Sequence, residues 1–549
     1  MTNYALSRRT SDTTSSRTVA MAATFDLTPL ELPVTYLCRK LNVADHVVLA
    51  NYGQAVEEVL NPTSTLATNK SGANVVLLRT ADICRTSPRE TVQQLAAFLA
   101  QRLESIAATH SAPWIFGVAP SLCLSTRDAR QFDRRLSDML TEILGIYKLP
   151  LHNLAHRYRI NQVFDPFLDD VANVPFTEEY FAGIAAAITR QLSALTCAPY
   201  KVLALDCDDT LWGGNCSDTI DRELDVSGGH EFLQRFATEQ LRAGRLLCLV
   251  SHNVEQDVWR ALERRHMPLC KDDFVTWRIG WESKTDALRS LAEELNLGLD
   301  SFVFVDNDRL QCELVREELP SVTVVELSSH PDTWPDILEH VWKFDVTDIT
   351  DDDRHRPERY RAELVRRRQA ARASDLDAFL SDLRLEIDWV PLDDTHLDRA
   401  AQLTLRTNQF TMTARRYTPH QLRVLLQDPN CSGWAVAARD RLGDYGFVGL
   451  AIGMLRGTSF VVDTFLLSCR VLGRRIETRM IDQLRSAAAA DGASYVRLDL
   501  VPTSRNEPAR RFLADLGPIV VDPDGVLHCD LAVTPDGTRL TLPHAVADQ

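Results

Sequence analysis

The stretch from Lys201 to Gly214, KVLALDCDDTLWGG, constrains the fold of this chain more than any other. Residues 202–205 are apolar and carboxylates follow at once, which is typical of a buried parallel strand whose carboxyl end opens onto a site. Asp206 and Asp208 are two positions apart, so strand geometry would point both side chains the same way. Adjacent carboxylates repel one another and lose hydration, and a divalent cation is the usual compensation. The stretch therefore predicts a cation site at a strand end.

Two further apolar strands are expected to end in polar residues. Residues 245–253 (RLLCLVSHN) end in a short polar run, and residues 301–308 (SFVFVDND) end in acid. Between them, Lys284 stands at the start of an expected helix. Ligands in open parallel sheets bind beyond the carboxyl ends of the strands. These segments are therefore predicted to converge on one site.

Length and charge limit the possible functions. The 549 residues are too many for one core at about 150 residues per domain. The net charge of −16 argues against nucleic acid as a partner. The apolar runs fall short of the roughly 18 residues that span a bilayer, and the first residues lack the apolar core of a signal peptide. We expect a soluble cytoplasmic protein with no membrane partner. The 12 cysteines show no zinc spacing or disulfide framework.

Changes in pattern along the chain predict an α/β multidomain fold with a parallel sheet in the centre and an α+β C-terminal part. The expected segments are a disordered N-terminus (1–24), an α/β domain of unassigned role (25–197), an α/β catalytic domain (198–345), a charged, solvated linker helix (346–374) and an α+β domain (375–549).

In the first domain, strands are expected at 46–50, 74–79 and 114–120, and helices at 89–109 and 128–147. Its polar candidates are Asn51, Asn69 and His156, for which turn and cap roles are favoured over ligand binding. In the last domain, strands are expected at 434–440, 447–455 and 459–467, followed by residues 468–484 running into a helix.

The polar strand ends resemble the four motifs of the haloacid dehalogenase (HAD) superfamily of phosphotransferases. The resemblance implies that Asp206 is the nucleophile and a Mg²⁺ ligand, and that Asp208 is the general acid and base with its backbone carbonyl on the metal. It makes Asp306 the remaining metal ligand. A carboxylate can accept a phosphoryl group when a cation and a lysine offset the anion's charge. The implied substrate and phosphate ligands are Thr210, Trp212, Gly213, Gly214, Ser251, His252, Asn253 and Lys284. Asp308 is a weaker candidate that a helix cap explains.

A more specific resemblance runs from about Asn42 to Gly517. The stretches LDCDDTLWGG, IGWESK, ELNLGLDSFVFVDND, RTNQFTMTARR and LLSCRVLGRRIE resemble the FkbH-like family, in which a GNAT-like acyltransferase module follows a HAD domain. This implies that 1,3-bisphosphoglycerate is the small acyl phosphate substrate and that phosphate is released. It also implies that the glyceryl group passes through an enzyme thioester to the phosphopantetheine thiol of an acyl carrier protein, in polyketide biosynthesis.

Two cysteines compete for the thioester. Cys207 would lie beside Mg²⁺ and Lys284, where a thiolate is stabilised, but strand alternation would turn it into packing, and both interpretations stay open. Cys469 precedes residues 470–474, which resemble the GNAT pyrophosphate loop, although Arg475 replaces its last small residue. The implied acyl and pantetheine ligands are Asn408, Gln409, Cys469, Arg470, Gly473, Arg474 and Asn506.

Two alternative functions remain, a HAD phosphatase acting on a phosphorylated pathway intermediate and a non-catalytic scaffold that docks carrier proteins. Residues 215–218 (NCSD), His252, Arg309 and Gln311 depart from the family pattern, which leaves the identity of the acyl group open. Docking of an acidic carrier would need basic surface, and the candidates are residues 366–372 with Arg474, Arg475, Arg510 and Arg511.

Overall fold

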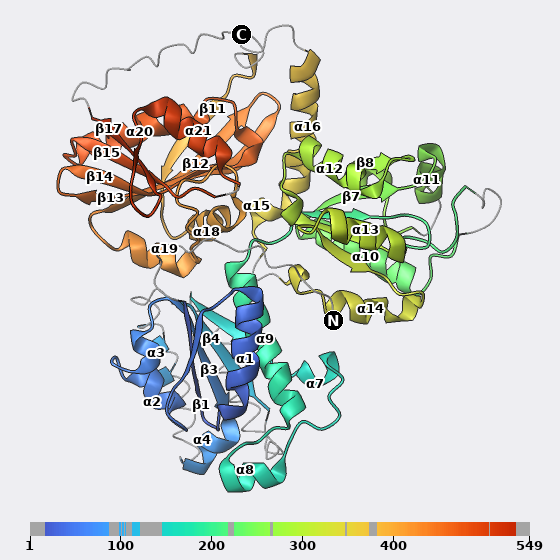
Figure 1. Ribbon diagram of the computed structural model, residues 1–549, viewed down its shortest axis with the longest axis vertical. Coiled ribbons are helices and arrows are strands. Elements are labelled where there is room, and N and C mark those ends of the chain that lie inside the picture. The colour runs from blue at the N-terminus through green and yellow to red at the C-terminus, as the bar shows by residue number, and fades with distance from the viewer. Residues whose placement is uncertain are drawn as a thin grey trace. The chain divides into compact units, whose positions relative to one another are not determined.

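The computed structural model describes residues 17–86, 98–99, 101–103, 105, 112–120, 145–217, 224–263, 267–345, 349–372, 382–503 and 505–533. The chain forms two compact units (Figure 1). The first comprises Met1–Pro199, Pro335–Asp348 and Thr418–Val424, and the second comprises the remaining residues. Within the described ranges, no helix is long and apolar enough to cross a membrane.

The first unit contains a parallel five-stranded sheet in the order β2-β1-β3-β4-β5. The strands are β1 (Thr18–Ala23), β2 (His46–Leu49), β3 (Gly72–Arg79), β4 (Trp114–Ala119) and β5 (Ile146–Leu149). The expectation of disorder up to residue 24 is wrong for Thr18–Ala23, because this apolar strand is buried and pairs with a neighbour on each side. Residues 1–16 and most of the helices expected at 89–109 and 128–147 lie outside the described residues, and residues 146–147 belong to β5.

Helices cover both faces of this sheet. One core contains buried residues of α1 (Thr28–Leu41) and α9 (Glu178–Thr196). A second core contains residues of α2 (Ala55–Leu60) and α3 (Thr65–Thr68). The remaining helices are α4 (Thr80–Thr86), α7 (Leu154–Arg157) and α8 (Pro166–Ala172). Asn69 Nδ2 donates hydrogen bonds to the carbonyls of Thr18 and Ala73, so this candidate joins β1 to β3.

The second unit contains the predicted central parallel sheet, in the order β10-β9-β6-β7-β8. Its strands are β6 (Val202–Leu205), β7 (Leu246–Ser251), β8 (Phe274–Ile279), β9 (Phe302–Asp306) and β10 (Thr323–Glu326). The helices are α10 (Gly229–Arg242), α11 (Glu255–Leu262), α12 (Lys284–Leu295) and α13 (Arg309–Glu318). Helix α14 (Trp334–Glu339) comes next in the chain, and all but its first residue belong to the first unit. Because β6 pairs in parallel with both β7 and β9, the carboxyl ends of all three strands lie side by side.

The charged segment after residue 345 forms α15 (Asp351–Arg354) and α16 (Arg356–Arg372). The prediction of a helix is confirmed, but the prediction of a solvated one is wrong. Tyr360 and Leu364 pack into the core of the central sheet. Arg366 is buried and its Nη2 lies 2.9 Å from Asp440 Oδ1. Helix α16 therefore packs inside the second unit, to which it belongs, and Arg366 is not available to dock a partner.

The C-terminal part has an α+β fold, as predicted, with the strand order β11-β12-β13-β14-β15-β17-β16. All neighbouring strands are antiparallel except β14 and β15. The strands are β11 (Glu386–Pro391), β12 (Cys431–Asp440), β13 (Gly443–Arg456), β14 (Ser459–Leu467), β15 (Tyr495–Leu500), β16 (Val520–Val521) and β17 (Leu527–Ala532). The helices are α18 (Leu397–Arg406), α19 (Pro419–Leu426), α20 (Ile476–Ala490) and α21 (Glu507–Leu516).

Candidate active site

The carboxyl ends of β6 and β9 meet the start of α12 in a buried ionic cluster. Lys284 Nζ lies 2.9 Å from Asp206 Oδ1 and 2.5 Å from Asp306 Oδ2. Asp306 has no exposed surface, and Asp206 and Lys284 are almost fully buried. The Ser283 side chain caps the helix by accepting a hydrogen bond from the Asp286 N–H, which fixes where Lys284 enters the site. The structure thus brings these three predicted residues together.

The cluster carries more negative charge than its lysine balances. Burial alone would lower the pKa of Lys284, but the charges of Asp206 and Asp306 outweigh burial and raise it. Burial, together with the charge of Asp206, raises the pKa of Asp306 to about 6. Two carboxylates that share one ammonium in a buried place leave one negative charge to be balanced.

This donor set fits a magnesium ion. Asp206 and Asp306 offer hard carboxylate oxygens, and Mg²⁺ is commonly held by one or two carboxylates together with water. No group of three or more His, Cys, Asp or Glu side chains that could hold a metal occurs in the part of the chain that the structure describes. The donors that the structure places together for the cation are the carboxylates of Asp206 and Asp306.

The carboxylate of Asp208, the third predicted metal residue, is held by hydrogen-bond donors. Its Oδ1 accepts hydrogen bonds from Trp212 Nε1 at 2.9 Å and from the Cys216 N–H at 3.0 Å. Its Oδ2 accepts one from Asn253 Nδ2 at 3.1 Å. Such a fixed carboxylate suits a general acid and base better than a side-chain metal ligand. The sequence did not single out the contribution of Cys216, which is a backbone contact.

The other expected phosphate ligands divide into two groups. Ser251 is buried and accepts a hydrogen bond from Asn253 Nδ2, and Thr210 donates one to Asn307 Oδ1, so both lie with the strand ends. His252, in contrast, contacts the carbonyl of Glu282. Two glycines of the group shape the loop after β6: Gly214 has a φ of +93° and donates its N–H to Asp209 Oδ1, and the Gly213 N–H donates to the Asp225 carbonyl. Asp308, the weaker candidate, caps α13 as expected.

Cys207 is a packed residue. Its side chain has no exposed surface. Burial and the charges of Asp206 and Asp208 raise the pKa of its thiol well above the ordinary value. Its full burial agrees with the packing interpretation, and the neighbouring carboxylates oppose a further negative charge on the thiol.

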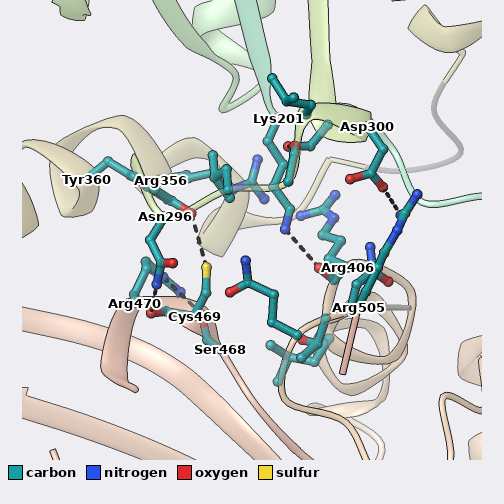
Figure 2. Close-up of a pocket in the computed structure, with 18 of the residues that line it drawn as sticks. Lys201, Asn296, Asp300, Arg356, Tyr360, Arg406, Ser468, Cys469, Arg470 and Arg505 are labelled. Carbon is teal, nitrogen blue, oxygen red and sulfur yellow. Dashed lines mark hydrogen bonds and ion pairs between the residues drawn. The ribbon is translucent and has the colours of Figure 1, made fainter. Parts of the chain in front are cut away.

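Cys469 lines a cavity of about 360 Å³ in the second unit (Figure 2). The cavity lies at the amino-terminal ends of β6 and β9, because Lys201 and Ser301 in its wall come directly before these strands. It is therefore at the opposite end of the strands from Asp206. Four of the predicted acyl and pantetheine ligands line it, namely Asn408, Gln409, Cys469 and Arg470.

The other predicted ligands of this group have structural contacts. Arg474 Nη2 lies 2.8 Å from Glu363 Oε2, in an ion pair that is mostly buried. Asn506 is buried and donates from Nδ2 to the carbonyls of Thr411 and Val501, so its side-chain amide holds these two segments together. Gly473 has a φ of +78° and shapes the turn before α20. The cavity wall also contains Lys201, which opens the stretch KVLALDCDDTLWGG, and Arg406, which opens RTNQFTMTARR. No sequence motif indicated the other cationic residues of the wall, Arg356, Arg399 and Arg505.

No family model matches the chain, and no curated protein sequence matches it. A solved structure is similar, the N-terminal part of the protein BF1531 from Bacteroides fragilis, which contains a phosphatase domain and is complexed with Mg. The TM-score is 0.53 at 19% sequence identity, and the match covers 60% of this chain and 94% of that one. This likeness shows that the matched part of the chain shares its fold with that protein.

Acetyltransferases match a smaller share of the chain. The ribosomal-protein-S18-alanine N-acetyltransferase from Escherichia coli has a TM-score of 0.22 at 14% identity, with 27% of this chain and 95% of that chain covered. A GNAT acetyltransferase from Staphylococcus aureus has a TM-score of 0.22 at 10% identity, with 26% and 99% covered. The α+β class of the C-terminal part rests on its own strand order.

Proposed function

We propose that this protein is a cytoplasmic, Mg²⁺-dependent enzyme of the FkbH-like kind. It would release phosphate from a small acyl phosphate, 1,3-bisphosphoglycerate, and transfer the glyceryl group through an enzyme cysteine to the phosphopantetheine thiol of an acyl carrier protein, in polyketide-type biosynthesis. The observation that carries the proposal is the buried cluster of Asp206, Lys284 and Asp306 at the carboxyl end of a HAD-like sheet.

The phosphoryl step uses Asp206 and Asp208, the two acids that follow β6. An oxygen of Asp206 attacks the phosphorus, and the bond from phosphorus to the leaving oxygen breaks. Asp208 gives that oxygen a proton when it departs as an alkoxide, and later takes one from the water that hydrolyses the aspartyl phosphate. Lys284 offsets the negative charge of the phosphate. Asp206 and Asp306 would hold Mg²⁺, which supplies further compensation of that charge.

The acyl step is assigned to Cys469. Cys207 is closed to solvent, whereas Cys469 is partly exposed and lines a cavity. Lys201 and Asp206 stand at the two ends of β6, roughly 16 Å apart at the rise of an extended strand. A small substrate cannot contact both sites at once. The acyl group must therefore move between them, which a flexible carrier arm allows.

The direct test is the intact mass of a purified acyl carrier protein after incubation with this protein, Mg²⁺ and 1,3-bisphosphoglycerate. We expect a carrier heavier by one glyceryl group, together with released phosphate, and a carrier that keeps the ester phosphate when Asp206→Asn replaces wild type. An unmodified carrier with normal phosphate release would indicate a plain phosphatase. Loss of both would leave the docking scaffold as the remaining function.

A further inference from the structure

Positive charge gathers around the cavity that contains Cys469 (Figure 2). Three carboxylates pair with the cations of its wall: Arg505 pairs with Asp300, Arg399 with Asp352, and Arg356 and Arg406 share Asp353. Asp352 is also shared with Arg359. The cationic side chains lining the cavity are Lys201, Arg356, Arg399, Arg406, Arg470 and Arg505. The wall therefore has a surplus of positive charge.

Three of these arginines hold donors that nothing satisfies. Arg399 Nε, Arg406 Nε and Arg470 Nη1 are buried and have no hydrogen-bond partner among the described residues. Arg470 exposes 7% of its surface and Arg399 9%, and the side chain of Arg406 exposes 9%. A buried charged donor without an acceptor is costly. All three side chains line the cavity, so an anion bound there would offset their positive charge.

The charged forms of Arg406 and Lys201 are also disfavoured where they stand. Burial and the charge of Arg356 lower the pKa of Arg406. Burial lowers the pKa of Lys201 to about 8, and the charges of Arg356 and Arg406 act in the same direction. Cys469 acts in the opposite direction but does not outweigh them. A guanidinium keeps its proton in proteins, so the repulsion persists until an anion enters.

A thiol shares this space. Cys469 Sγ lies 3.9 Å from the Tyr360 hydroxyl, and the Cys469 carbonyl accepts a hydrogen bond from Asn296 Nδ2 at 2.9 Å. Burial raises the pKa of Tyr360, so its hydroxyl keeps its proton and can donate to sulfur. A cavity of about 360 Å³ is large enough for a small phosphorylated acid.

We propose that this cavity binds a phosphorylated small hydroxy-acyl donor, with its acyl phosphate group against Arg399, Arg406 and Arg470 and its acyl carbon facing the Cys469 thiol. The inference deepens the proposed function and rests on it. It assigns the acyl phosphate to this cavity and leaves a phosphate ester to the Asp206 site at the other end of the sheet.

The chemical step is thioester formation. The sulfur of Cys469 attacks the acyl carbon and forms a carbon–sulfur bond. The bond from that carbon to the phosphate oxygen breaks, and the phosphate leaves with the electron pair and takes up the thiol proton. The guanidinium groups of Arg399, Arg406 and Arg470 stabilise the departing phosphate, as preorganised positive groups do wherever negative charge develops.

Binding can be measured without the reaction. Isothermal titration calorimetry on the full chain in EDTA would compare three probes, inorganic phosphate, 3-phosphoglycerate and pantetheine 4′-phosphate. We expect 3-phosphoglycerate to bind most tightly and its Kd to rise about tenfold or more in Arg470→Gln, the loss of one charge-assisted hydrogen bond. Arg470 suits this test because, among the described residues, its side chain donates one long hydrogen bond, from Nε to Ser468 Oγ at 3.4 Å, so its replacement removes little else. Arg497→Gln, an exposed arginine paired with Asp530, is the matched control and should bind as wild type.

A second readout follows the thiol. 3-Phosphoglycerate should slow the alkylation of Cys469 by iodoacetamide in wild type and in Arg497→Gln, but not in Arg470→Gln, as measured by peptide mass spectrometry. Equal affinity in wild type and Arg470→Gln, or the absence of 3-phosphoglycerate binding, would overturn the inference. Binding of pantetheine 4′-phosphate alone would overturn the assignment of the acyl donor.

The inference and the proposed function can fail separately. Asp206→Asn should abolish the hydrolysis of the phosphate ester of 3-phosphoglycerate and leave alkylation protection unchanged. If that hydrolysis survives in Asp206→Asn, the proposed function falls while the cavity result stands. If protection is absent while wild type still hydrolyses the ester, the cavity inference alone falls.

Discussion

Lys284 Nζ lies 2.5 Å from the carboxylate of Asp306, which has no exposed surface. The same ammonium lies 2.9 Å from Asp206. One lysine on α12 thus compensates carboxylates at the ends of two neighbouring strands. The electrostatic stability of the site and its capacity to hold an anionic substrate both depend on this side chain.

Replacing Lys284 tests this dependence. Lys284→Met leaves two buried carboxylates uncompensated, and we expect the free energy of unfolding to fall by about 3–5 kcal/mol, with phosphate release lost. Urea denaturation followed by circular dichroism measures the first effect. Lys40→Met, which removes a lysine over the exposed Tyr36 ring, should change stability by less than about 0.5 kcal/mol. Equal stabilities of the two variants would contradict the assignment.

Binding of Mg²⁺ should be visible in thermal stability. A ligand that binds the folded protein raises its Tm. We expect the addition of Mg²⁺ to EDTA-treated protein to raise the Tm of wild type, and the shift to be lost in Asp306→Asn. Asp308→Asn retains the cap of α13 and should keep the shift. A shift that persists in Asp306→Asn would place the ion elsewhere.

The hydrogen bond from Trp212 to Asp208 should matter for turnover. Trp212→Phe removes the indole donor 2.9 Å from Asp208 Oδ1 and keeps most of the buried ring. A hydrogen bond to a charged group contributes about 1.5–3 kcal/mol, so we expect kcat for phosphate release to fall at least tenfold with little change in KM. Trp281→Phe alters an exposed indole and serves as the control. A change confined to KM would indicate that Trp212 acts in substrate binding instead.

Asp353 gives a pH-dependent prediction for the fold. Burial alone would raise its pKa, but the charges of Arg356 and Arg406 hold the pKa well below its ordinary value. A carboxyl group with a lowered folded-state pKa contributes stability fully above its unfolded pKa of about 3.9, and this stability is lost as pH falls toward the folded pKa. We expect Asp353→Asn to lower the free energy of unfolding by about 3–5 kcal/mol at pH 7.

The difference between wild type and Asp353→Asn should then shrink as pH falls below about 4. Denaturation series at several pH values would show the trend. Asp351→Asn, at an exposed position of the same helix, should stay close to wild type throughout. A difference that is constant with pH would contradict the ion-pair explanation.

The two cysteines should differ in reactivity. Cys469 is partly exposed in its cavity and Cys207 is closed to solvent, so we expect iodoacetamide to label Cys469 at least tenfold faster. Intact mass after incubation with 1,3-bisphosphoglycerate should show an acyl adduct in wild type and Cys207→Ala, and none in Cys469→Ser. An adduct that persists in Cys469→Ser would move the thioester to another cysteine.

Local pattern was sufficient for much of the Asp206 site. Asp206, Ser251 and Asp306 each lie at the end of an apolar run, and parallel strands place their carboxyl ends together whatever the details of packing. Trp212 and Asn253 were expected as phosphate ligands, whereas the structure shows them hydrogen-bonded to the Asp208 carboxylate, and the third partner, the Cys216 backbone N–H, had no signal in the sequence. The strand Thr18–Ala23 was missed because its apolar run follows a polar segment and is made mostly of small residues.

Helix α16 is a second case in which the sequence pattern was not sufficient. Residues 356–372 are so rich in arginine that solvation was the natural expectation, yet Arg366 is buried against Asp440. Its partner lies 74 residues away in sequence. The pattern of a single segment carries no information about such a contact.

The amino-acid sequence by itself determined the parallel central sheet, the α+β C-terminal part and the residues that surround Lys284, because strand periodicity and strand-end polarity act over a few neighbouring residues. The tertiary structure alone decided that Cys207 is packed, that Asn506 joins two loops, and that Cys469 shares a cavity with six cationic side chains. The physical reason is that burial and electrostatic balance depend on segments brought together from distant parts of the chain.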